Sequence, residues 1–144
     1  MSTVQSVLAR KGGQVVTIGV ADTALTAATL MNERGIGGLV VLDGARVAGM
    51  FTERDILRRV VAMRRDPATT SVREVMTTPV AYCRRETTLD ECRAVMTEKR
   101  IRHLPVVDEK GVCGIVTIGD LLAHDVTDQQ ATIQYLNEYI FGVR

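Results

Sequence analysis

The sequence predicts an α/β (α+β) fold of two tandem β-α-β-β-α repeats packed sheet to sheet about a pseudo-two-fold axis. A shift of 65 positions lays residues 80–122 on residues 15–57 without a gap. The shift pairs Val15 with Val80, Thr23 with Thr88, Met31 with Met96, Leu39 with Leu104, Gly49 with Gly114, Thr52 with Thr117 and Asp55 with Asp120. Each copy alternates β-branched runs with amphipathic helical runs. A small sheet cannot cover both of its faces alone, so the copies are expected to pack together.

Each copy is predicted to contain a strand, a helix, two strands joined by a hairpin, and a closing helix. In the first copy the strands are expected at residues 15–18, 38–42 and 46–51. The first helix is expected to carry Ala24, Ala27, Ala28 and Met31 on one face, and the closing helix to run through Ile56, Leu57, Val60 and Val61. Asp22-Thr23 is placed to cap the first helix, and Gly35 is a natural terminator for it. Asp43-Gly44 separates the two strands and is a hairpin turn signal.

A Gly-x-x-Thr-x-x-Asp motif closes each copy where its last strand meets its last helix. It reads Gly49-Met-Phe-Thr52-Glu-Arg-Asp55 in the first copy and recurs 65 residues later. This places a hydroxyl and a carboxylate at a helix N-terminus, whose unpaired N–H groups favour anionic ligands. The Thr-x-x-Asp spacing is also that of a capping box, with Asp in place of Glu or Gln, so both pairs can serve as caps alone.

Composition and charge narrow the classes of function. Lys+Arg 18 against Asp+Glu 17 leaves a net charge of +1, which offers no basic field to nucleic acid. With no Trp, three Tyr and two Phe, the composition also disfavours a platform that stacks single-stranded bases on aromatic side chains. Three scattered cysteines and two histidines show no metal-like spacing and fit a reducing cytoplasm. The N-terminus lacks a signal peptide pattern, and no apolar run is long enough to cross a bilayer. We expect a cytoplasmic protein with no membrane or metal site.

The segments of the chain are assigned from these patterns. We place the first repeat at residues 4–65, a linker at 66–71, the second repeat at 72–125 and a C-terminal helical extension at 126–144. A short apolar face at Val4, Val7 and Leu8 predicts a helical turn ahead of the first strand. Ile133, Leu136, Tyr139 and Ile140 recur at helical spacing, so the extension is expected either to self-associate or to pack back on its own chain.

The duplicated unit, the motif and the run Ile-Arg-His-Leu-Pro-Val-Val-Asp at residues 101–108 together resemble a tandem pair of CBS domains, or Bateman module. The likeness covers residues 4 to 125. It implies a regulatory module, without catalytic activity, that binds adenine nucleotides in two clefts between its repeats. In ligand-binding members the motif Asp holds the ribose hydroxyls, the motif Thr meets phosphate, and the opposite repeat contributes the starts of its first and second strands. AMP, ATP and NAD share the same adenosine group, and a homodimer is expected.

Carried over residue by residue, the resemblance makes the two clefts unequal. The first cleft would join Thr52, Asp55, Ala81, Ile101, Arg102 and His103, and the second would join Thr117, Asp120, Val16, Ile36, Gly37 and Gly38. Arg102 can bind a phosphate through its planar fork, and His103 adds a pH-dependent donor. The matching positions of the second cleft carry no charge. We therefore expect the first cleft to prefer phosphate-bearing ligands and the second to hold a nucleoside loosely or stay empty.

Other readings of these residues stay open. Arg54 lies within the first motif, from where it could reach a phosphate held by a partner chain. Arg102 and His103 follow a helix end and can complement its dipole, while Gly37-Gly38 can simply allow close packing. A nucleotide hydrolase would need a carboxylate cluster or an activated nucleophile, and we find neither. A structural dimerisation module with no ligand is the remaining alternative.

Overall fold

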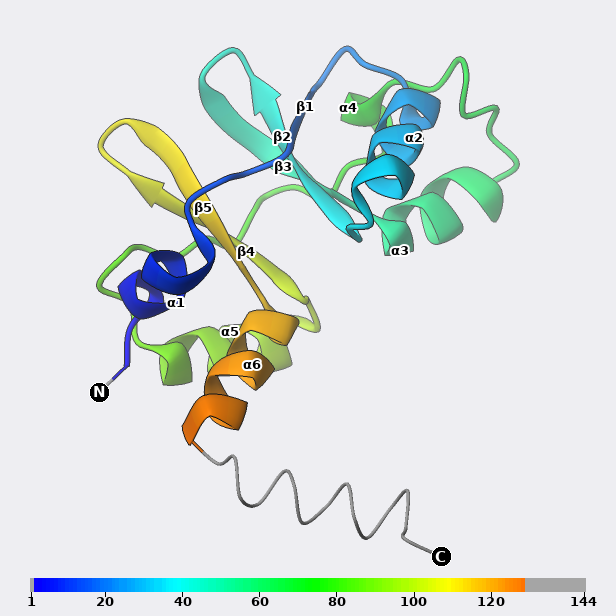
Figure 1. The fold of residues 1–144 in the computed structure, drawn as a ribbon. Helices are drawn as coiled ribbons and strands as arrows, with labels where there is room; N and C mark the ends of the chain where they lie inside the picture. The colour runs from blue at the N-terminus through cyan, green and yellow to red at the C-terminus, as the bar shows by residue number, and fades with distance from the viewer. Residues whose placement is uncertain (1, 129–144) are drawn as a thin grey trace, which may run out of the picture.

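A computed structural model describes residues 2–128 (Figure 1). The elements of the first copy are α1 (Val4–Lys11), β1 (Thr17–Gly19), α2 (Ala24–Arg34), β2 (Gly38–Asp43), β3 (Arg46–Thr52), α3 (Glu53–Asp55) and the π-helix η1 (Ile56–Val61). Those of the second copy are α4 (Val72–Val75), α5 (Leu89–Lys99), β4 (His103–Asp108), β5 (Gly111–Thr117) and α6 (Ile118–Asp128). The order confirms the predicted duplicated fold. The apolar stripe predicted at residues 133–140 lies outside the described residues.

The two copies share their strand pairing, register and irregularities. β2 pairs antiparallel with β3, and β4 pairs antiparallel with β5. Each pair is irregular at the same point, between Val41 and Leu42 in the first copy and between Val106 and Val107 in the second. The 65-residue shift therefore relates the two hairpins residue by residue, including the position of the irregularity.

The first strand of the second copy is shorter than the shift predicts. In the first copy β1 pairs parallel with β2 over three residues, including Ile18 with Val41. The equivalent pairing in the second copy is a single bridge between Cys83 and Val106. The chain turns away directly afterwards, because the Arg84 N–H donates to the Thr87 hydroxyl at 2.9 Å instead of continuing the ladder.

The short helices ahead of each repeat are exchanged between the two cores. Val4, Val7 and Leu8 of α1, which precedes the first repeat, are buried with the core residues of the second repeat. Val72 and Val75 of α4, which precedes the second repeat, are buried in the core of the first. The sequence predicted a helical turn at residues 4–8 but not this exchange, since an apolar face does not say which core it enters.

The glycine of each motif makes room for an exchanged helix or for the residues that directly follow it. A Cβ on Gly114 would lie 2.6 Å from Leu8 Cδ2, and a Cβ on Gly49 would lie 2.7 Å from both Met76 Sδ and the Thr77 carbonyl oxygen. Such distances are far inside van der Waals contact. The motif glycines therefore have a packing role that explains why glycine stands at the same place in both copies.

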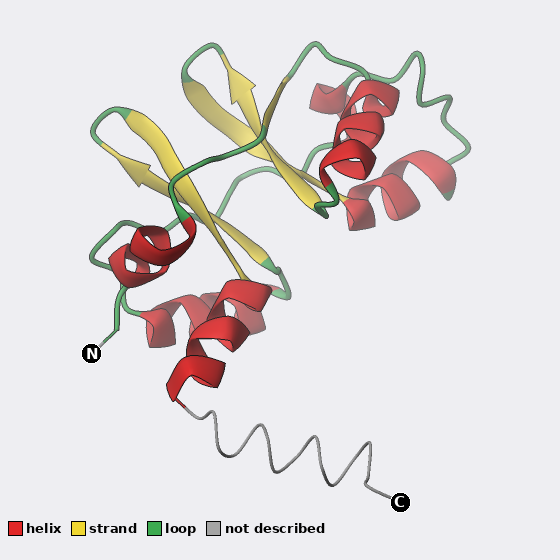
Figure 2. Ribbon diagram, viewed as in Figure 1, coloured by secondary structure: helices red, strands yellow, loops and turns green. Residues whose placement is uncertain are grey.

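The two sheets face each other and the longer helices cover their outer sides (Figure 2). Gly38 at the start of β2 lies against His103 at the start of β4, with 3.1 Å between an ideal Cβ and the ring Nε2. Gly111, at the start of β5, lies near the Ala45 carbonyl oxygen of the other hairpin, 3.7 Å from an ideal Cβ. Because Gly38 and His103 are 65 residues apart, equivalent positions meet across the interface, as a pseudo-two-fold axis requires.

Residues 66–71, predicted to be a linker, form backbone hydrogen bonds with the first repeat. Residues 66–69 are exposed as expected, but Thr70 is buried. Its carbonyl accepts the Ala24 N–H at 2.8 Å, and the Pro67 carbonyl accepts the Leu25 N–H at 3.0 Å. These bonds satisfy N–H groups at the start of α2, which the helix itself leaves unpaired.

Candidate functional site

Both motifs lie at the turn from the last strand of a repeat to its last helix, as predicted. The Thr52 N–H donates to Asp55 Oδ2 at 3.0 Å, and the Thr117 N–H donates to Asp120 Oδ2 at 2.8 Å. Each carboxylate thus caps the start of its own helix, so the capping interpretation of the motif holds in this structure. What distinguishes the two sites is the further partner of each carboxylate.

The Asp55 carboxylate is buried and both of its oxygens have partners. The residue is 5% exposed. Oδ1 accepts the Thr77 hydroxyl at 2.8 Å and lies 3.6 Å from Arg59 Nε, while Oδ2 accepts the Thr52 N–H. Thr77 follows α4, so it reaches Asp55 from the exchanged segment.

The Asp120 carboxylate is held by a cation that the sequence prediction missed. Lys11 Nζ lies 2.7 Å from Asp120 Oδ2 and also donates to the Ile115 carbonyl at 2.9 Å. Lys11 ends α1, so it too comes from an exchanged segment. The four positions predicted to line the second cleft opposite this motif are uncharged, but Lys11 brings a positive charge to it. A local pattern cannot reveal this pair, because 109 residues separate its members.

His103 lies between the two predicted clefts. Its ring packs on Gly38, and the Glu53 carboxylate lies over the adjacent Gly37, so the absence of side chains there admits both groups. Burial lowers the pKa of His103 below its usual 6.5, and Arg102 and Lys11 lower it further, whereas Glu53 and Asp120 act in the opposite sense. His103 is therefore neutral at pH 7. Of the two basic residues predicted for the first cleft, Arg102 is the one that carries a charge at pH 7.

Three arginines line a hollow of about 250 Å³ between the repeats. Its lining residues are Arg54, Met96, Thr97, Arg100, Ile101, Arg102 and Ile118, with no carboxylate among them. Arg54 Nη1 donates to the Arg100 carbonyl at 2.7 Å, which links the first motif to the end of α5. Within residues 2–128 no hydrogen bond or ion pair engages the guanidinium groups of Arg100 and Arg102. We call this pocket, with its seven lining residues, the arginine hollow.

The arginine hollow contains part of the predicted first cleft. Ile101, Arg102 and Arg54 line it together. Thr52, Asp55, Ala81 and His103 are not among its lining residues, and Ala81 packs instead against the second core. Val16 and Ile36, predicted for the second cleft, pack against the first core.

Arg100 was missed because its position depends on backbone geometry. It follows α5 in the left-handed conformation, with φ 55°, a place usually taken by glycine or asparagine. Its equivalent in the first copy is Gly35, which has φ 63°. The shift between the copies could have suggested a helix end at this position, but not the direction of the arginine side chain.

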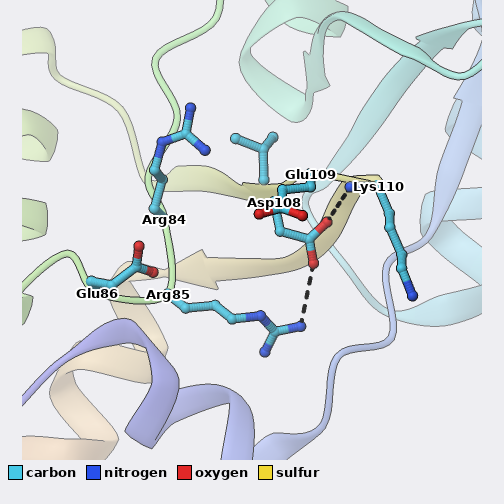
Figure 3. A pocket seen from close by; sticks show the side chains of 7 residues that line it. Arg84, Arg85, Glu86, Asp108, Glu109 and Lys110 are labelled. Atoms are coloured by element: carbon cyan, nitrogen blue, oxygen red, sulfur yellow. Dashed lines mark hydrogen bonds and ion pairs between the residues drawn. The ribbon is translucent and has the colours of Figure 1, made fainter.

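A second hollow, of about 310 Å³, lies at the tip of the β4–β5 hairpin (Figure 3). Its lining residues are Arg84, Arg85, Glu86, Val107, Asp108, Glu109 and Lys110. Asp108 Oδ1 accepts the Lys110 N–H at 2.8 Å, and Asp108 Oδ2 lies 3.7 Å from Arg85 Nη2. The Lys110 N–H and the Arg85 charge lower the pKa of Asp108. Because three cations and three carboxylates line this hollow together, it lacks the uniformly positive lining of the arginine hollow.

Residues 2–128 contain neither a cluster of metal-ligating side chains nor a helix suited to span a membrane. No group of three or more His, Cys, Asp or Glu side chains in this part of the chain is arranged to hold a metal ion. Among the described helices, none combines the length and apolar character needed to cross a membrane.

Comparisons with known proteins agree with the duplicated fold. The sequence profile of the CBS domain matches residues 4–62 and 72–126. Over 126 residues the chain is 36% identical to the CBS domain-containing protein CBSX3, mitochondrial, of Arabidopsis thaliana, spanning 84% of this chain and 61% of that protein. It is 35% identical to the CBS domain-containing protein YhcV of Bacillus subtilis, covering 82% and 84% of the two chains. The structure of a putative signal-transduction protein with CBS domains from Burkholderia ambifaria superposes with a TM-score of 0.85 at 43% identity, covering 89% of this chain and 96% of that one.

Proposed function

Because the chain belongs to the CBS-domain family, whose members are generally regulatory, non-catalytic and commonly bind adenine nucleotides, we propose that it is a regulatory module that binds an adenine nucleotide between its two repeats. AMP, ATP and the AMP half of NAD are the candidate ligands. The protein acts without catalysis, as a homodimer in the cytoplasm.

The arginine hollow is the observation that carries this proposal. Arg54 comes from the first repeat, whereas Arg100 and Arg102 come from the second, and among residues 2–128 no lining carboxylate neutralises them. Guanidinium groups bind phosphate through parallel N–H donors, and three of them around one hollow favour an anion with several oxygens. Ile101 and Ile118 add apolar surface. Phosphate groups of a nucleotide match this combination.

The adenosine end of the ligand is assigned to Asp55. The neighbouring Arg54 lines the hollow, so a ligand held by its phosphates would have its ribose close to the first motif. Asp55 Oδ1 already accepts the Thr77 hydroxyl at 2.8 Å. A ribose hydroxyl replacing that donor keeps the buried carboxylate satisfied, so the exchange costs little. The ligand thereby competes with one internal hydrogen bond.

The second cleft is the weaker site in this proposal. A ribose that binds Asp120 has to share the carboxylate with Lys11, which lies at 2.7 Å. His103 and Glu53 lie over the glycines that were expected to line this cleft. Both features reduce the space and the free acceptors available to a nucleoside.

Ligand binding can be transmitted through the relative placement of the repeats. Arg54 and Arg102 lie on different repeats, so an anion between them favours the arrangement that brings both within reach. A ligand shifts such an equilibrium only by its difference in affinity for the two arrangements.

Thermal unfolding with and without ligand tests the proposal. AMP, ATP and NAD at a hundredfold excess over the dissociation constant should each stabilise the protein by about 2.7 kcal/mol if they bind. Arg102→Ala should reduce this stabilisation, whereas Arg84→Ala, an exposed arginine outside the arginine hollow, should preserve it. If no adenine nucleotide raises Tm, the chain is a structural dimerisation module instead. Release of phosphate or nicotinamide from these ligands would contradict the absence of catalysis.

A further inference from the structure

The last residue of α1 binds the second repeat at two points beside its motif. Lys11 Nζ lies 2.7 Å from Asp120 Oδ2 and donates to the Ile115 carbonyl at 2.9 Å. Under the proposed function Asp120 is the carboxylate that a ribose binds in the second cleft. The ammonium group of Lys11 therefore occupies the acceptor that a ligand hydroxyl needs.

The first copy is built differently at the equivalent place. There Thr77, which follows α4, exchanges two backbone hydrogen bonds of 3.0 and 2.8 Å with Met50 of β3. The shift of 65 positions makes Gly12 the equivalent of Thr77 and Ile115 the equivalent of Met50. The Gly12 N–H bonds back within its own helix instead, and the Ile115 carbonyl accepts the Lys11 ammonium. A side chain thus fastens α1 to β5, where a backbone pair fastens the other segment to β3.

A side-chain contact of this kind can be exchanged for a ligand. The side chains of Lys11 and Asp120 are 29% and 20% exposed, so water reaches both partners. A lysine stem is flexible and its ammonium is strongly hydrated, so the group can leave the carboxylate without a backbone rearrangement. Asp120 Oδ2 also accepts the Thr117 N–H at 2.8 Å, and a ribose hydroxyl would restore the second bond.

The other side chains near this cleft leave Lys11 as its removable closure. Glu53 lies over Gly37 but is exposed, so its carboxylate can turn outward. His103 packs against Gly38 between the sheets and forms one wall of the cleft. Only the lysine contact has to break before a hydroxyl can reach the motif carboxylate.

Two glycines follow Lys11 at the junction between the repeats. Figure 1 shows the chain leaving α1, beside the second sheet, and crossing to β1 of the first. Gly12 has φ 90°, in the region that favours glycine. A Cβ on Gly13 would lie 2.8 Å from the Cys113 carbonyl oxygen, so the chain packs directly on β5. A change at Lys11 therefore acts on the segment that joins the two repeats.

We propose that Lys11 is a latch that closes the second cleft in the free protein. A ligand hydroxyl that binds Asp120 displaces the ammonium and frees the end of α1 from β5. Occupancy of the second cleft is thereby coupled to the position of α1, to the extent that the ligand binds the open form better. The latch rests on the proposed function, because the competing hydroxyl is that of an adenine nucleotide.

Calorimetric titration with AMP tests the closure. Wild type should bind one AMP per chain, at the first cleft, and Lys11→Ala should bind two. Lys110→Ala is the matched control, because it removes an exposed lysine from the β4–β5 hairpin, and it should bind one. Adding Asp120→Ala to Lys11→Ala should return the stoichiometry to one. A single AMP per chain in Lys11→Ala, or a second site that survives Asp120→Ala, would overturn the latch and leave the proposed function intact.

Amide hydrogen exchange of the free protein tests the fastening without a ligand. Residues 9–13 should exchange several-fold faster in Lys11→Ala than in wild type and in Lys110→Ala. Residues 24–34 of α2 should exchange alike in all three proteins, which checks that the fold is intact. Equal exchange at residues 9–13 would overturn the latch. Because no ligand is involved, this measurement decides on the latch even where no nucleotide binds and the proposed function fails.

Discussion

Replacing Thr77 by valine isolates the internal hydrogen bond that a ribose would have to displace. Valine keeps the shape of the side chain but removes the hydroxyl that donates to Asp55 Oδ1 at 2.8 Å. Asp55 is 5% exposed, and the remaining neighbour of that oxygen, Arg59 Nε, lies at 3.6 Å, so the buried carboxylate loses its one short bond at Oδ1. Hydrogen bonds to charged groups contribute about 1.5–3 kcal/mol.

Urea unfolding should therefore show Thr77→Val to be about 2 kcal/mol less stable than wild type. A drop of about 2–4 °C in Tm per kcal/mol is expected for a chain of this size. Thr77→Ser, which keeps the hydroxyl, is the control and should retain most of the stability. Nucleotide affinity should move the other way, because a ribose no longer has to displace an internal donor. Equal stability of the valine variant and wild type, or weaker nucleotide binding by the valine variant, would refute this reasoning.

Three further predictions follow from the same geometry. Lys11→Met should cost about 1 kcal/mol in urea unfolding at low salt, because it removes a partly buried pair with Asp120, and an undiminished stability would count against that pair. The lowered pKa of His103 means that the unfolded chain binds its proton more readily, so the stability that His103 contributes is present above pH 6.5 and lost as pH falls through the folded-state pKa. His103→Gln should flatten the fall in unfolding free energy from pH 7 to pH 5, and an unchanged slope would assign the effect elsewhere. Gly49→Ala should cost about 3 kcal/mol, because its Cβ would lie 2.7 Å from the Thr77 carbonyl oxygen, and a variant with wild-type Tm would contradict this packing.

The fold could be predicted because duplication makes weak local signals reinforce each other. A single Thr-x-x-Asp sequence cannot be told from a cap, but two copies in the same context indicated the strand-to-helix turn at Thr52 and Thr117. The shift also aligned Gly38 with His103, which meet across the sheets. Periodicity therefore specified the elements and the way the repeats face each other.

The site was predicted only in part because its decisive contacts are long-range. The resemblance selected Ile101 and Arg102 for the first cleft, and both line one hollow. Arg54 lines the same hollow, although it was expected to reach a phosphate held by a partner chain. The resemblance missed Lys11 and Thr77, since both come from segments that are exchanged between the repeats. Sequence periodicity tells which face of a short helix is apolar, but the choice of core depends on three-dimensional packing.

Residue types alone also do not predict whether a side chain is buried or which protonation state it adopts. His103 was expected to be a donor whose strength depends on pH, and its burial lowers its pKa and leaves the ring neutral at pH 7. Asp55 was expected either to hold a ribose or to cap its helix, and both of its oxygens have partners within the protein. A residue type gives the chemistry that a side chain can perform, and the surrounding packing decides which form is present.

Calorimetric titration of ATP into wild-type protein and into Arg102→Ala tests the central claim most directly. Wild type should bind with measurable heat, and the variant should bind at least about tenfold more weakly, because it loses charge-assisted hydrogen bonds worth about 1.5–3 kcal/mol. Equal affinity of the two proteins would show that the arginine hollow does not hold the phosphates. Absence of binding by wild type to ATP, AMP and NAD alike would contradict the nucleotide-sensing account itself.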